Sequence, residues 1–230
     1  EWPVSNGDSS FVEVDAVNDS GELRPFNIRG NVDRVDEVIL SQELQARAIK
    51  DNLLLPGGDA TTPLNLRNPT SSGPARRWVI IRDLKTVNGP KVGESGKRHL
   101  KALFNEIQLG LYARAWELAH PGDRVVGVGV MEVGEGSTHY VEIDPEIEPY
   151  LDGLSLGERT LLTANQFRFS DDESYQSNGF RAWMNERLQT ARRAVDTAAS
   201  GHIHPVPSSS CSFCNVRSIC PSSVLGGESR

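Results

Sequence analysis

The sequence predicts an α/β domain in which helices flank a central mixed β-sheet, followed by a loop-rich cysteine tail. Alternating and β-branched runs occur in the first half of the chain and return after residue 122, which favours strands. Two long segments carry apolar residues at helical spacing, and all three cysteines lie in one short stretch near the end. A chain of 230 residues can bury one core and carry a small appendage. We therefore expect a core at residues 1–200 and a cysteine-rich tail at residues 201–230 that packs on it.

The expected strands share either an alternation of apolar and polar residues or a continuous β-branched run. The segment "RPFNIRGNVDRVDEVIL" reads as two extended segments or as one long strand bent at Gly30. The last two strands are expected to form a hairpin across residues 134–136. The expected strands lie at residues 10–17, 24–40, 76–86, 123–133 and 138–144.

The clearest expected helix covers residues 94–120, with Ser95 as its N-cap and Pro121 just after its end. A second helix is expected at residues 179–200, where Gly201 stops it. The apolar stripe of the first helix consists of Leu100, Leu103, Phe104, Ile107 and Leu111.

Two other segments have weaker patterns. Residues 145–169 are expected to be helical in pieces. From residue 41 to residue 74 the periodicity is lost, and Gly, Pro, Ser, Thr and Asn become frequent. We therefore expect a mobile surface insertion at residues 41–74, to which the sequence assigns no role.

The net charge of −7 argues against non-specific nucleic-acid binding through bulk charge, although it allows a local basic groove. No apolar run approaches the roughly 18–20 residues of a membrane span, so no membrane association is expected. The chain opens without Met and without the basic and apolar regions of a signal peptide. We therefore expect a cytoplasmic protein of which this chain is a piece.

The chemistry-bearing residues begin with Asp33 in "GNVDRVD" and with Asp83 and Lys85 in "RDLKT". Because side chains alternate along a strand, Asp83 and Lys85 share one face and Leu84 is expected to point into the core. Two carboxylates from neighbouring strands can hold Mg²⁺ or Mn²⁺, and a nearby lysine can orient water and stabilise phosphoryl charge. These groups together can catalyse phosphodiester hydrolysis. The Asp-x-Lys motif alone is more often a solvated strand-end ion pair.

Two further motifs lie later in the chain. Gln108 and Tyr112 lie one turn apart on one helical face, which also fits an ordinary amphipathic helix with a half-buried tyrosine. The tail has the spacing Cys-x2-Cys-x5-Cys, which favours zinc or an iron–sulfur cluster over a disulfide plus a free thiol. Zinc would take His202 or His204 as its fourth ligand, whereas a cluster would need a fourth cysteine that this chain lacks. The three thiols belong to Cys211, Cys214 and Cys220.

The order of these motifs, "GNVDRVD", "RDLKT", "QLGLYA" and "CSFCNVRSIC", resembles the RecB-type nucleases of the PD-(D/E)xK superfamily. Within them it looks most like the nuclease domains of bacterial recombination helicases of the AddB and AdnB kind. The resemblance spans about residues 13–221 and implies a restriction-endonuclease-like core. It implies an Mg²⁺-dependent deoxyribonuclease, an exonuclease, that acts on DNA in double-strand break end processing and recombinational repair. The implied partner is a helicase domain or a partner helicase–nuclease subunit.

The resemblance also implies a role for individual residues. Asp33 and Asp83 would be metal ligands, with the Leu84 carbonyl as a third, and Lys85 the catalytic lysine. Gln108 and Tyr112 would line the site and touch DNA, and Glu13 matches a glutamate often found on the preceding strand. Three of the four ligands of a 4Fe–4S cluster, which would pin the tail to the core, would be Cys211, Cys214 and Cys220.

Two elements of the family pattern are missing, namely an active-site histidine and the first cluster cysteine, both upstream of the first strand. We therefore expect the isolated piece to lack an intact cluster and to have weak or no nuclease activity. Backbone phosphates could be contacted by the basic residues near the site, although ordinary surface charge explains each of them equally well. These residues are Arg34, Lys91, Lys97, Arg98 and Lys101.

Three alternatives remain open at this point. One is a CRISPR-associated RecB-like nuclease, which also ends in a cysteine cluster. Another is a catalytically silent nuclease-like module that binds DNA or serves as a scaffold. The third is a plain zinc-binding module, which predicts zinc and no iron.

Overall fold

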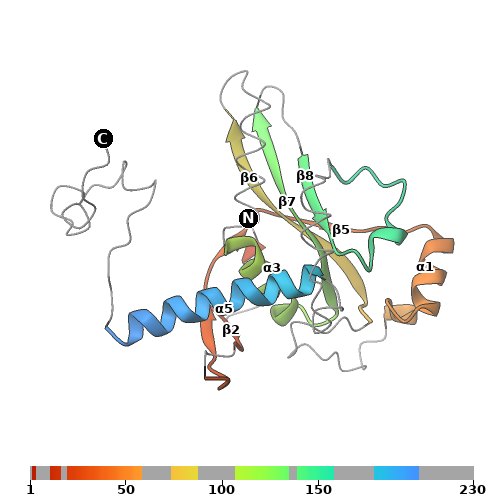
Figure 1. Ribbon diagram of the computed structural model, residues 1–230. Coiled ribbons are helices and arrows are strands. Elements are labelled where there is room, and N and C mark those ends of the chain that lie inside the picture. Colours follow the sequence, from red (N-terminus) through yellow and green to blue (C-terminus); the bar gives the residue numbers. More distant parts are fainter. Residues whose placement is uncertain are drawn as a thin grey trace. The chain divides into compact units, whose positions relative to one another are not determined.

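The computed structural model describes residues 2–3, 11–16, 20–58, 74–87, 107–134, 139–157 and 179–201 (Figure 1). The chain divides into two compact units, Glu1–Arg192 and Arg193–Arg230. The first unit holds the sheet and the candidate site. Of the second unit, the described part is the helical stretch from residue 193 to residue 201.

The main sheet has four strands in the order β5-β6-β7-β8. Strands β5 and β6 are antiparallel, β6 and β7 are parallel, and β7 and β8 are antiparallel, which confirms the expected mixed sheet. A parallel pair needs a long crossover, and the helix α3 lies in the one between β6 and β7. The four strands are β5 (Arg34–Glu37), β6 (Arg77–Val87), β7 (Asp123–Gly134) and β8 (His139–Ile143).

Two small antiparallel pairs precede the main sheet. Within the described residues 11–16, the strand expected at residues 10–17 is the three-residue β2 (Val12–Val14), which pairs with β3 (Phe26–Ile28). The other pair joins β1 (Trp2–Pro3), which precedes β2 in the chain, to β4 (Asn31–Val32), which follows β3. The segment at residues 24–40 therefore contains three short strands, β3, β4 and β5, rather than one or two long ones.

One face of the sheet is covered by α3 (Gln108–Ala119) and by the first part of α5 (Gly179–Ala199) (Figure 1). The apolar core on this face contains side chains of both helices, of the β2–β3 pair and of β6 and β7. Its largest fully buried members include Phe180, Ile81, Met184 and Leu188. The candidate site lies on this face of the sheet, where β6 continues past the last apolar core residue, Ile81.

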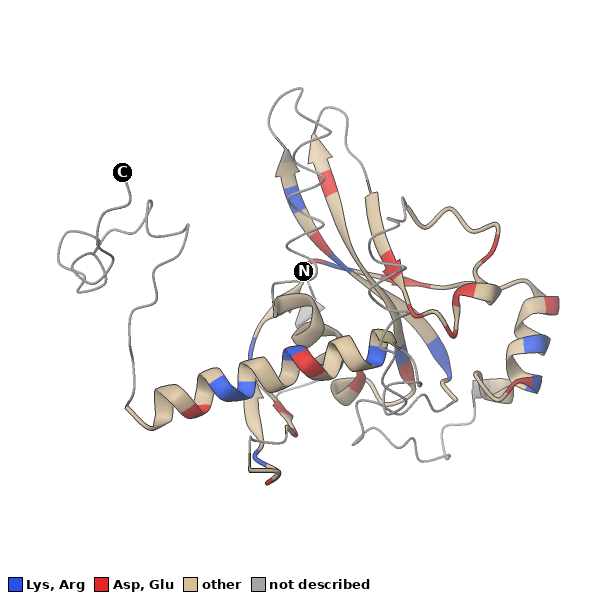
Figure 2. Cartoon of the chain, in the orientation of Figure 1, with Lys and Arg blue, Asp and Glu red and all other residues tan. Residues whose placement is uncertain are grey.

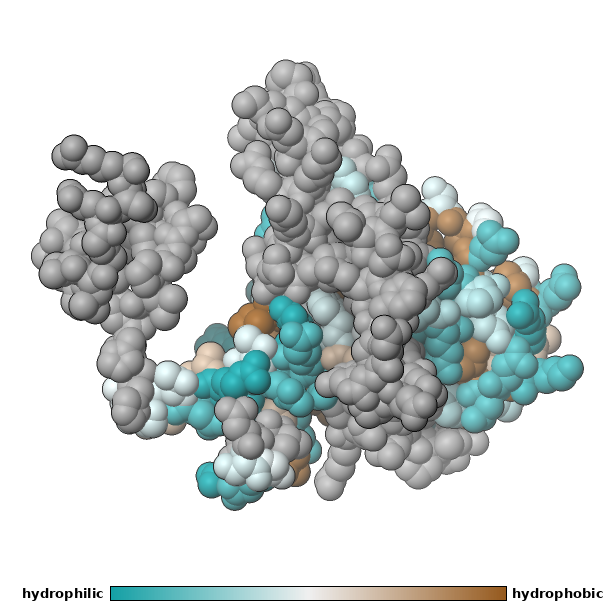
Figure 3. Space-filling model, viewed as in Figure 1, coloured by the Kyte–Doolittle hydropathy of each residue, from teal (hydrophilic) through white to brown (hydrophobic). Residues whose placement is uncertain are grey.

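A second core lies on the opposite face, around Trp78, Ile80 and Ile143. The short helix α1 (Gln42–Lys50) and the 3-10 turn η2 (Glu148–Tyr150) pack there through Ala48 and Tyr150. The described surface is mostly hydrophilic in the view of Figure 3. The most exposed of the large apolar side chains in the described part of the chain is Ile39, which is 79% exposed.

The segment at residues 41–74 has regular structure at its start. Ser41 caps α1 by accepting the backbone N–H of Leu44 at 3.3 Å, and Leu53 and Leu54 are buried just after the helix. The sequence pattern missed this helix because only Ala48 within it is buried, so it shows no apolar stripe. The later part of the segment, residues 59–73, lies outside the described residues.

The buried stripe of α3 differs from the expected one. Leu109, Ala113 and Trp116 are buried, whereas Ile107 and Leu111 are only partly buried at the edge of the core. The helix lies between the sheet and α5, and Gly110 faces the side chain of Arg187 so closely that a Cβ there would meet it at 2.8 Å. Burial on two sides therefore widens the buried face beyond a single stripe. The other expected stripe residues, Leu100, Leu103 and Phe104, and the cap Ser95 lie outside the described residues.

The turn η2 is the described helical piece within the expected 145–169 region, of which residues 158–169 are outside the described part. Helix α5 ends near Gly201, which has a positive φ of 76° that favours glycine. None of the helices in the described part of the chain is long and apolar enough to cross a membrane.

Candidate active site

The site begins where the β5–β6 ladder ends. The last backbone pair of this antiparallel ladder is Arg34 with Arg82, and continuing the same register by one residue sets Asp33 opposite Asp83. Residues that lie opposite each other in an antiparallel pair place their side chains on the same face. Asp33, just before β5, and Asp83 on β6 are therefore expected on one face of the sheet.

Asp33 is held in this position by a hydrogen bond. Its Oδ2 accepts the backbone N–H of Leu84 at 2.8 Å. At the end of the ladder a side-chain oxygen therefore replaces the backbone carbonyl as the acceptor. The Leu84 amide would otherwise have no strand partner on the β5 side, because β5 starts at Arg34. The bond fixes the Asp33 carboxylate beside the "RDLKT" segment.

Asp83 and Lys85 share one face, as the strand period predicts. The Lys85 Nζ lies 2.7 Å from the Asp83 Oδ2, and the two side chains are 36% and 10% exposed. The expectation that Leu84 enters the core is wrong, since it is 41% exposed. Leu84 lies on the face of Trp78 and Ile80, whose apolar core stops before it at the buried Arg82.

A further acidic residue, Glu132, lies on the same face, and no sequence motif pointed to it. In the parallel β6–β7 pair, Asp83 is in register with Val130 and Lys85 with Glu132. Glu132 is only 1% exposed. Glu132 follows Val128 and Val130 in the strand alternation, so it shares their face. That this face also carries Lys85 depends on the β6–β7 register, which shifts at the bulge after Val79.

The helix motif meets the "GNVD" motif through Tyr112. A Cβ atom at residue 30 would lie 2.8 Å from the Tyr112 Oη and 2.9 Å from its ring, so the tyrosine packs directly on Gly30. This close approach explains the glycine three residues before Asp33. Gln108 is the first residue of α3 and is half-buried one turn before Tyr112. No described contact joins Gln108 to Asp83 or Lys85.

Figure 2 shows residues of both charges on the upper parts of strands β6 and β7. Arg34 does not belong to the candidate site, because it lies on the opposite face and pairs with Asp36 at 2.6 Å.

Glu13 is exposed on β2 and alternates with the core residues Val12 and Val14, so it points away from the face on which α3 packs.

The opposite end of the sheet holds a buried ion-pair network that the sequence pattern does not reveal. Glu117 of α3 accepts from Arg181 of α5 at 2.7 and 2.9 Å and from the Val125 amide of β7 at 3.0 Å. Asp123 accepts from Arg77 at 2.7 Å and from the Trp116 indole at 2.9 Å. These bonds fix α3 against the sheet, and thereby the helix that carries Tyr112.

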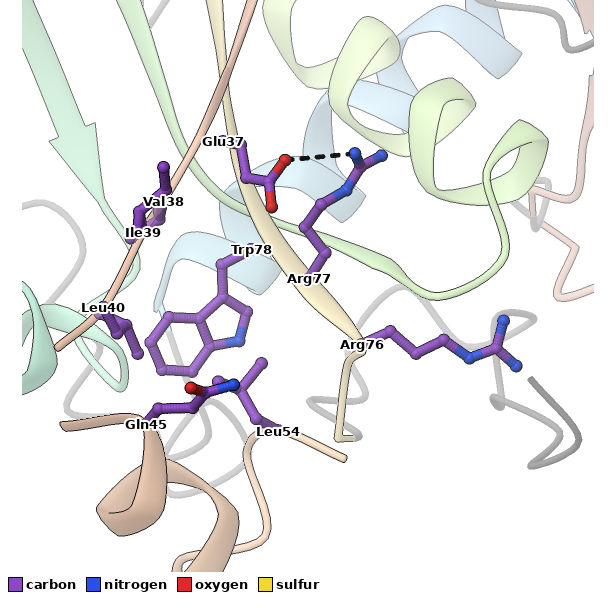
Figure 4. A pocket seen from close by; sticks show the side chains of 9 residues that line it. All are labelled: Glu37, Val38, Ile39, Leu40, Gln45, Leu54, Arg76, Arg77 and Trp78. Carbon is purple, nitrogen blue, oxygen red and sulfur yellow. Dashed lines mark hydrogen bonds and ion pairs between the residues drawn. The ribbon is translucent and has the colours of Figure 1, made fainter. Parts of the chain in front are cut away.

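A cavity of about 160 Å³ lies on the opposite face from Asp83, beside Trp78 at the start of β6 (Figure 4). Arg77 and Glu37 form an ion pair at its rim, with 3.4 Å between nitrogen and oxygen. Glu37 is the one acidic side chain among its lining residues, so this cavity does not offer a pair of carboxylates.

The donor set at Asp33 and Asp83 fits a hard divalent cation. It offers carboxylate and backbone carbonyl oxygens from β6 and from the residue just before β5, and Mg²⁺ and Mn²⁺ prefer such ligands. Among the described residues, no three His, Cys, Asp or Glu side chains are grouped closely enough to hold a metal. A cation would therefore take the two aspartates together with a backbone oxygen and water. The residues Cys211, Cys214, Cys220, Lys91, Lys97, Arg98 and Lys101 lie outside the described residues.

The comparisons with known proteins agree with this geometry. A family model of the PD-(D/E)XK nuclease superfamily matches residues 73–221, which is more than half of the 230-residue chain. The chain belongs to the PD-(D/E)XK nuclease superfamily, and its mixed sheet with flanking helices has the fold of that superfamily. The match includes Asp83, Lys85, Tyr112 and the three cysteines, whereas Asp33 lies before it. No curated protein and no solved structure gave a significant match.

Proposed function

We propose that this domain is a metal-dependent DNA nuclease whose site is formed by Asp33, Asp83 and Lys85. The observation that supports the proposal is a pair of contacts at the end of the β5–β6 ladder. The Asp33 carboxylate accepts the Leu84 amide at 2.8 Å, and the Lys85 ammonium lies 2.7 Å from the Asp83 carboxylate. Membership of the nuclease superfamily supports hydrolysis of phosphodiester bonds as the reaction.

The two aspartates and the Leu84 carbonyl would hold Mg²⁺ or Mn²⁺. When bound, such a cation polarises the phosphate and lowers the pKa of a coordinated water. Asp33 is oriented through its Oδ2 by the Leu84 amide, which leaves its second carboxylate oxygen as the one that would bind a cation. The Lys85 ammonium lies on the same face and would hold the attacking water and balance charge on the phosphate.

The substrate contacts are assigned to α3 and to backbone phosphates. Tyr112 and Gln108 would form the wall of the site on the side where α3 covers the sheet. DNA affinity would come from phosphate contacts, which carry no sequence information. The negative net charge of −7 makes such contacts local rather than general.

The motif order supports a finer proposal. The domain would act as an exonuclease within a helicase–nuclease that processes double-strand break ends, with a helicase domain or partner subunit beside it. Cys211, Cys214 and Cys220 would supply three of the four ligands of a 4Fe–4S cluster. Metal analysis and visible absorbance of the anaerobically purified full-length protein test this point, because zinc without iron would favour the zinc-binding alternative.

The test of the nuclease proposal is the substitution Asp83→Ala in the full-length protein, assayed on end-labelled DNA with Mg²⁺. We expect degradation to fall at least about 100-fold, because the cation that would stabilise charge on the phosphate loses one of its ligands. The matched control is Asp152→Ala, which removes an exposed aspartate from the segment after η2. Undiminished degradation by Asp83→Ala would favour the silent DNA-binding or scaffold alternative.

A further inference from the structure

Directly behind the candidate site, on the other face of the sheet, Asp36 joins two arginines. Its Oδ1 lies 2.6 Å from the Arg34 Nε and its Oδ2 lies 2.6 Å from the Arg82 Nε. We refer to Arg34, Asp36 and Arg82 as the rear charged cluster. One carboxylate therefore bridges an arginine of β5 and an arginine of β6.

The rear charged cluster is anchored on the neighbouring elements. Arg82 is 5% exposed, and its Nη2 donates to the Leu156 carbonyl at 2.6 Å. The Nη1 of Arg34 lies 3.4 Å from the sulfur of Met131 on β7. The packing around Arg82 is tight, because a Cβ at Gly129 would meet its Nη1 at 3.1 Å. The side chain of Arg82 therefore has little freedom to move away from Asp36.

The position of the rear charged cluster in the register gives it a consequence at the site. Arg34 and Arg82 are the last pair of the β5–β6 ladder, and each is the neighbour in sequence of one proposed metal ligand, Asp33 or Asp83. Two like charges directly opposite each other on a sheet repel and destabilise the pairing. The Asp36 carboxylate between them converts this repulsive pair into an attractive triad.

We propose that Asp36 is a positioning residue of the nuclease site, which keeps the last rung of the β5–β6 ladder closed and thereby holds Asp33 opposite Asp83. The inference rests on the proposed function, because it concerns the spacing of the two metal ligands. Asp36 touches neither the cation nor the substrate, since its side chain lies on the other face. It acts through the backbone of β5 and through the Asp33–Leu84 hydrogen bond.

The charge state of Asp36 supports this role. Burial acts to raise the pKa of the Asp36 carboxyl, but hydrogen bonds and charges from Arg34 and Arg82 outweigh burial, so this pKa is below its usual value. The carboxylate is therefore ionised at neutral pH, where the bridge is needed.

The test is Asp36→Asn, which keeps the size of the side chain and removes its charge. We expect Mn²⁺ binding, measured by calorimetry, to weaken about tenfold or more, as is usual when an outer partner of a metal ligand is removed. The Leu84 amide should exchange its hydrogen faster, because its acceptor Asp33 moves with the opened rung. Hydrolysis should need more Mg²⁺ for half-maximal rate, with a smaller change in the rate at saturating Mg²⁺.

Glu37→Gln is the matched control. Glu37 is the next residue on the same strand and also pairs with an arginine of β6, at 3.4 Å from Arg77, but it lies at the far end of the ladder and is exposed. We expect wild-type Mn²⁺ affinity and wild-type Leu84 exchange for this variant.

The double variant Arg34→Gln/Asp36→Asn separates positioning from a general loss of bonds. It removes one of the two repelling charges, so Mn²⁺ affinity and Leu84 protection should return toward wild type. The Arg34 side chain is about half exposed, at 47%, and belongs to neither apolar core, so its replacement leaves the core intact. If Asp36→Asn does not fold, the double variant alone decides, and weak Mn²⁺ binding by the folded double variant would overturn the inference.

The two proposals fail in different ways. Unchanged Mn²⁺ affinity and unchanged Leu84 exchange in Asp36→Asn would overturn the inference and leave the nuclease proposal standing. Wild-type Mn²⁺ binding by both Asp33→Asn and Asp83→Asn would instead overturn the metal site itself.

Discussion

The Asp33 carboxylate accepts the backbone N–H of Leu84 at 2.8 Å and closes the end of the β5–β6 ladder. This single bond joins the "GNVD" motif to the "RDLKT" motif across about fifty residues of intervening sequence. Lys85 contacts Asp83 one residue further on, so the two proposed metal ligands and the proposed catalytic lysine are fixed relative to the backbone of β6.

Replacing Asp33 with Ala should affect both stability and metal binding. The free energy of unfolding should fall by about 1 kcal/mol, because one hydrogen bond to a backbone amide is lost. Calorimetry with Mn²⁺ should detect no binding at concentrations that saturate the wild type. A variant that binds Mn²⁺ with wild-type affinity would remove Asp33 from the site, and Asp152→Ala serves as the reference for a general effect of losing one negative charge.

Replacing Lys85 with Ala should separate metal binding from catalysis. The ammonium would compete with a cation for the Asp83 carboxylate, so its removal should leave Mn²⁺ affinity unchanged or higher. The hydrolysis rate should nevertheless fall at least about 100-fold, because a charge-stabilising group is lost. Paired calorimetric and kinetic measurements check this, with Lys50→Ala on the exposed side of α1 as the control. A rate close to the wild type would contradict the role of Lys85.

Replacing Gly30 with Ala should displace Tyr112. The new Cβ would lie 2.8 Å from the Tyr112 Oη, so the tyrosine or the strand must move, at a cost of about 1–3 kcal/mol in unfolding free energy. Urea unfolding of Gly30→Ala, Tyr112→Ala and the double variant measures the coupling. In the Tyr112→Ala background the glycine substitution should cost much less. Additive effects would show that the two motifs do not meet in the way the structure places them.

Acid should weaken the contribution of Asp36 in a defined direction. Because the pKa of Asp36 is lowered in the folded state, its stabilisation is complete above the unfolded pKa of about 3.9 and is lost as the pH falls through the lower folded value. The difference in unfolding free energy between wild type and Asp36→Asn should therefore be constant near neutral pH and shrink below about pH 4. Denaturant unfolding at a series of pH values measures this difference. A difference that grows on acidification would contradict the assignment.

The buried ion pair at Glu117 should be far more sensitive than an exposed one. Replacing Glu117 with Ala removes the carboxylate 2.7 Å from the buried Arg181, which keeps Asp144 at 4.0 Å, and should cost about 3–5 kcal/mol. Glu37→Ala removes one carboxylate from an exposed pair and should cost less than about 1 kcal/mol. Thermal or urea unfolding compares the two, and similar small losses would mean that Asp144 compensates for the loss of Glu117.

The elements were predicted best where their pattern is local and long. The strand at residues 76–86 and the hairpin after residue 122 are indicated by runs of apolar residues, and both are present as β6, β7 and β8. Helix α1 escaped prediction because it buries only Ala48, and the break of residues 24–40 into three strands depends on separate partners for each. Short elements take their structure from tertiary contacts rather than from their own periodicity.

The sequence by itself determined that Asp83 and Lys85 share a face, because side chains in any strand alternate with a period of two. Only the tertiary structure decided that Leu84 is exposed, that Glu132 lies beside Lys85 and that Arg34 turns to Asp36 behind the sheet. These relationships depend on the register between strands that are far apart in the chain and on where the helices cover the sheet. Neither is encoded in the local pattern, since a shift of one residue would reverse every face.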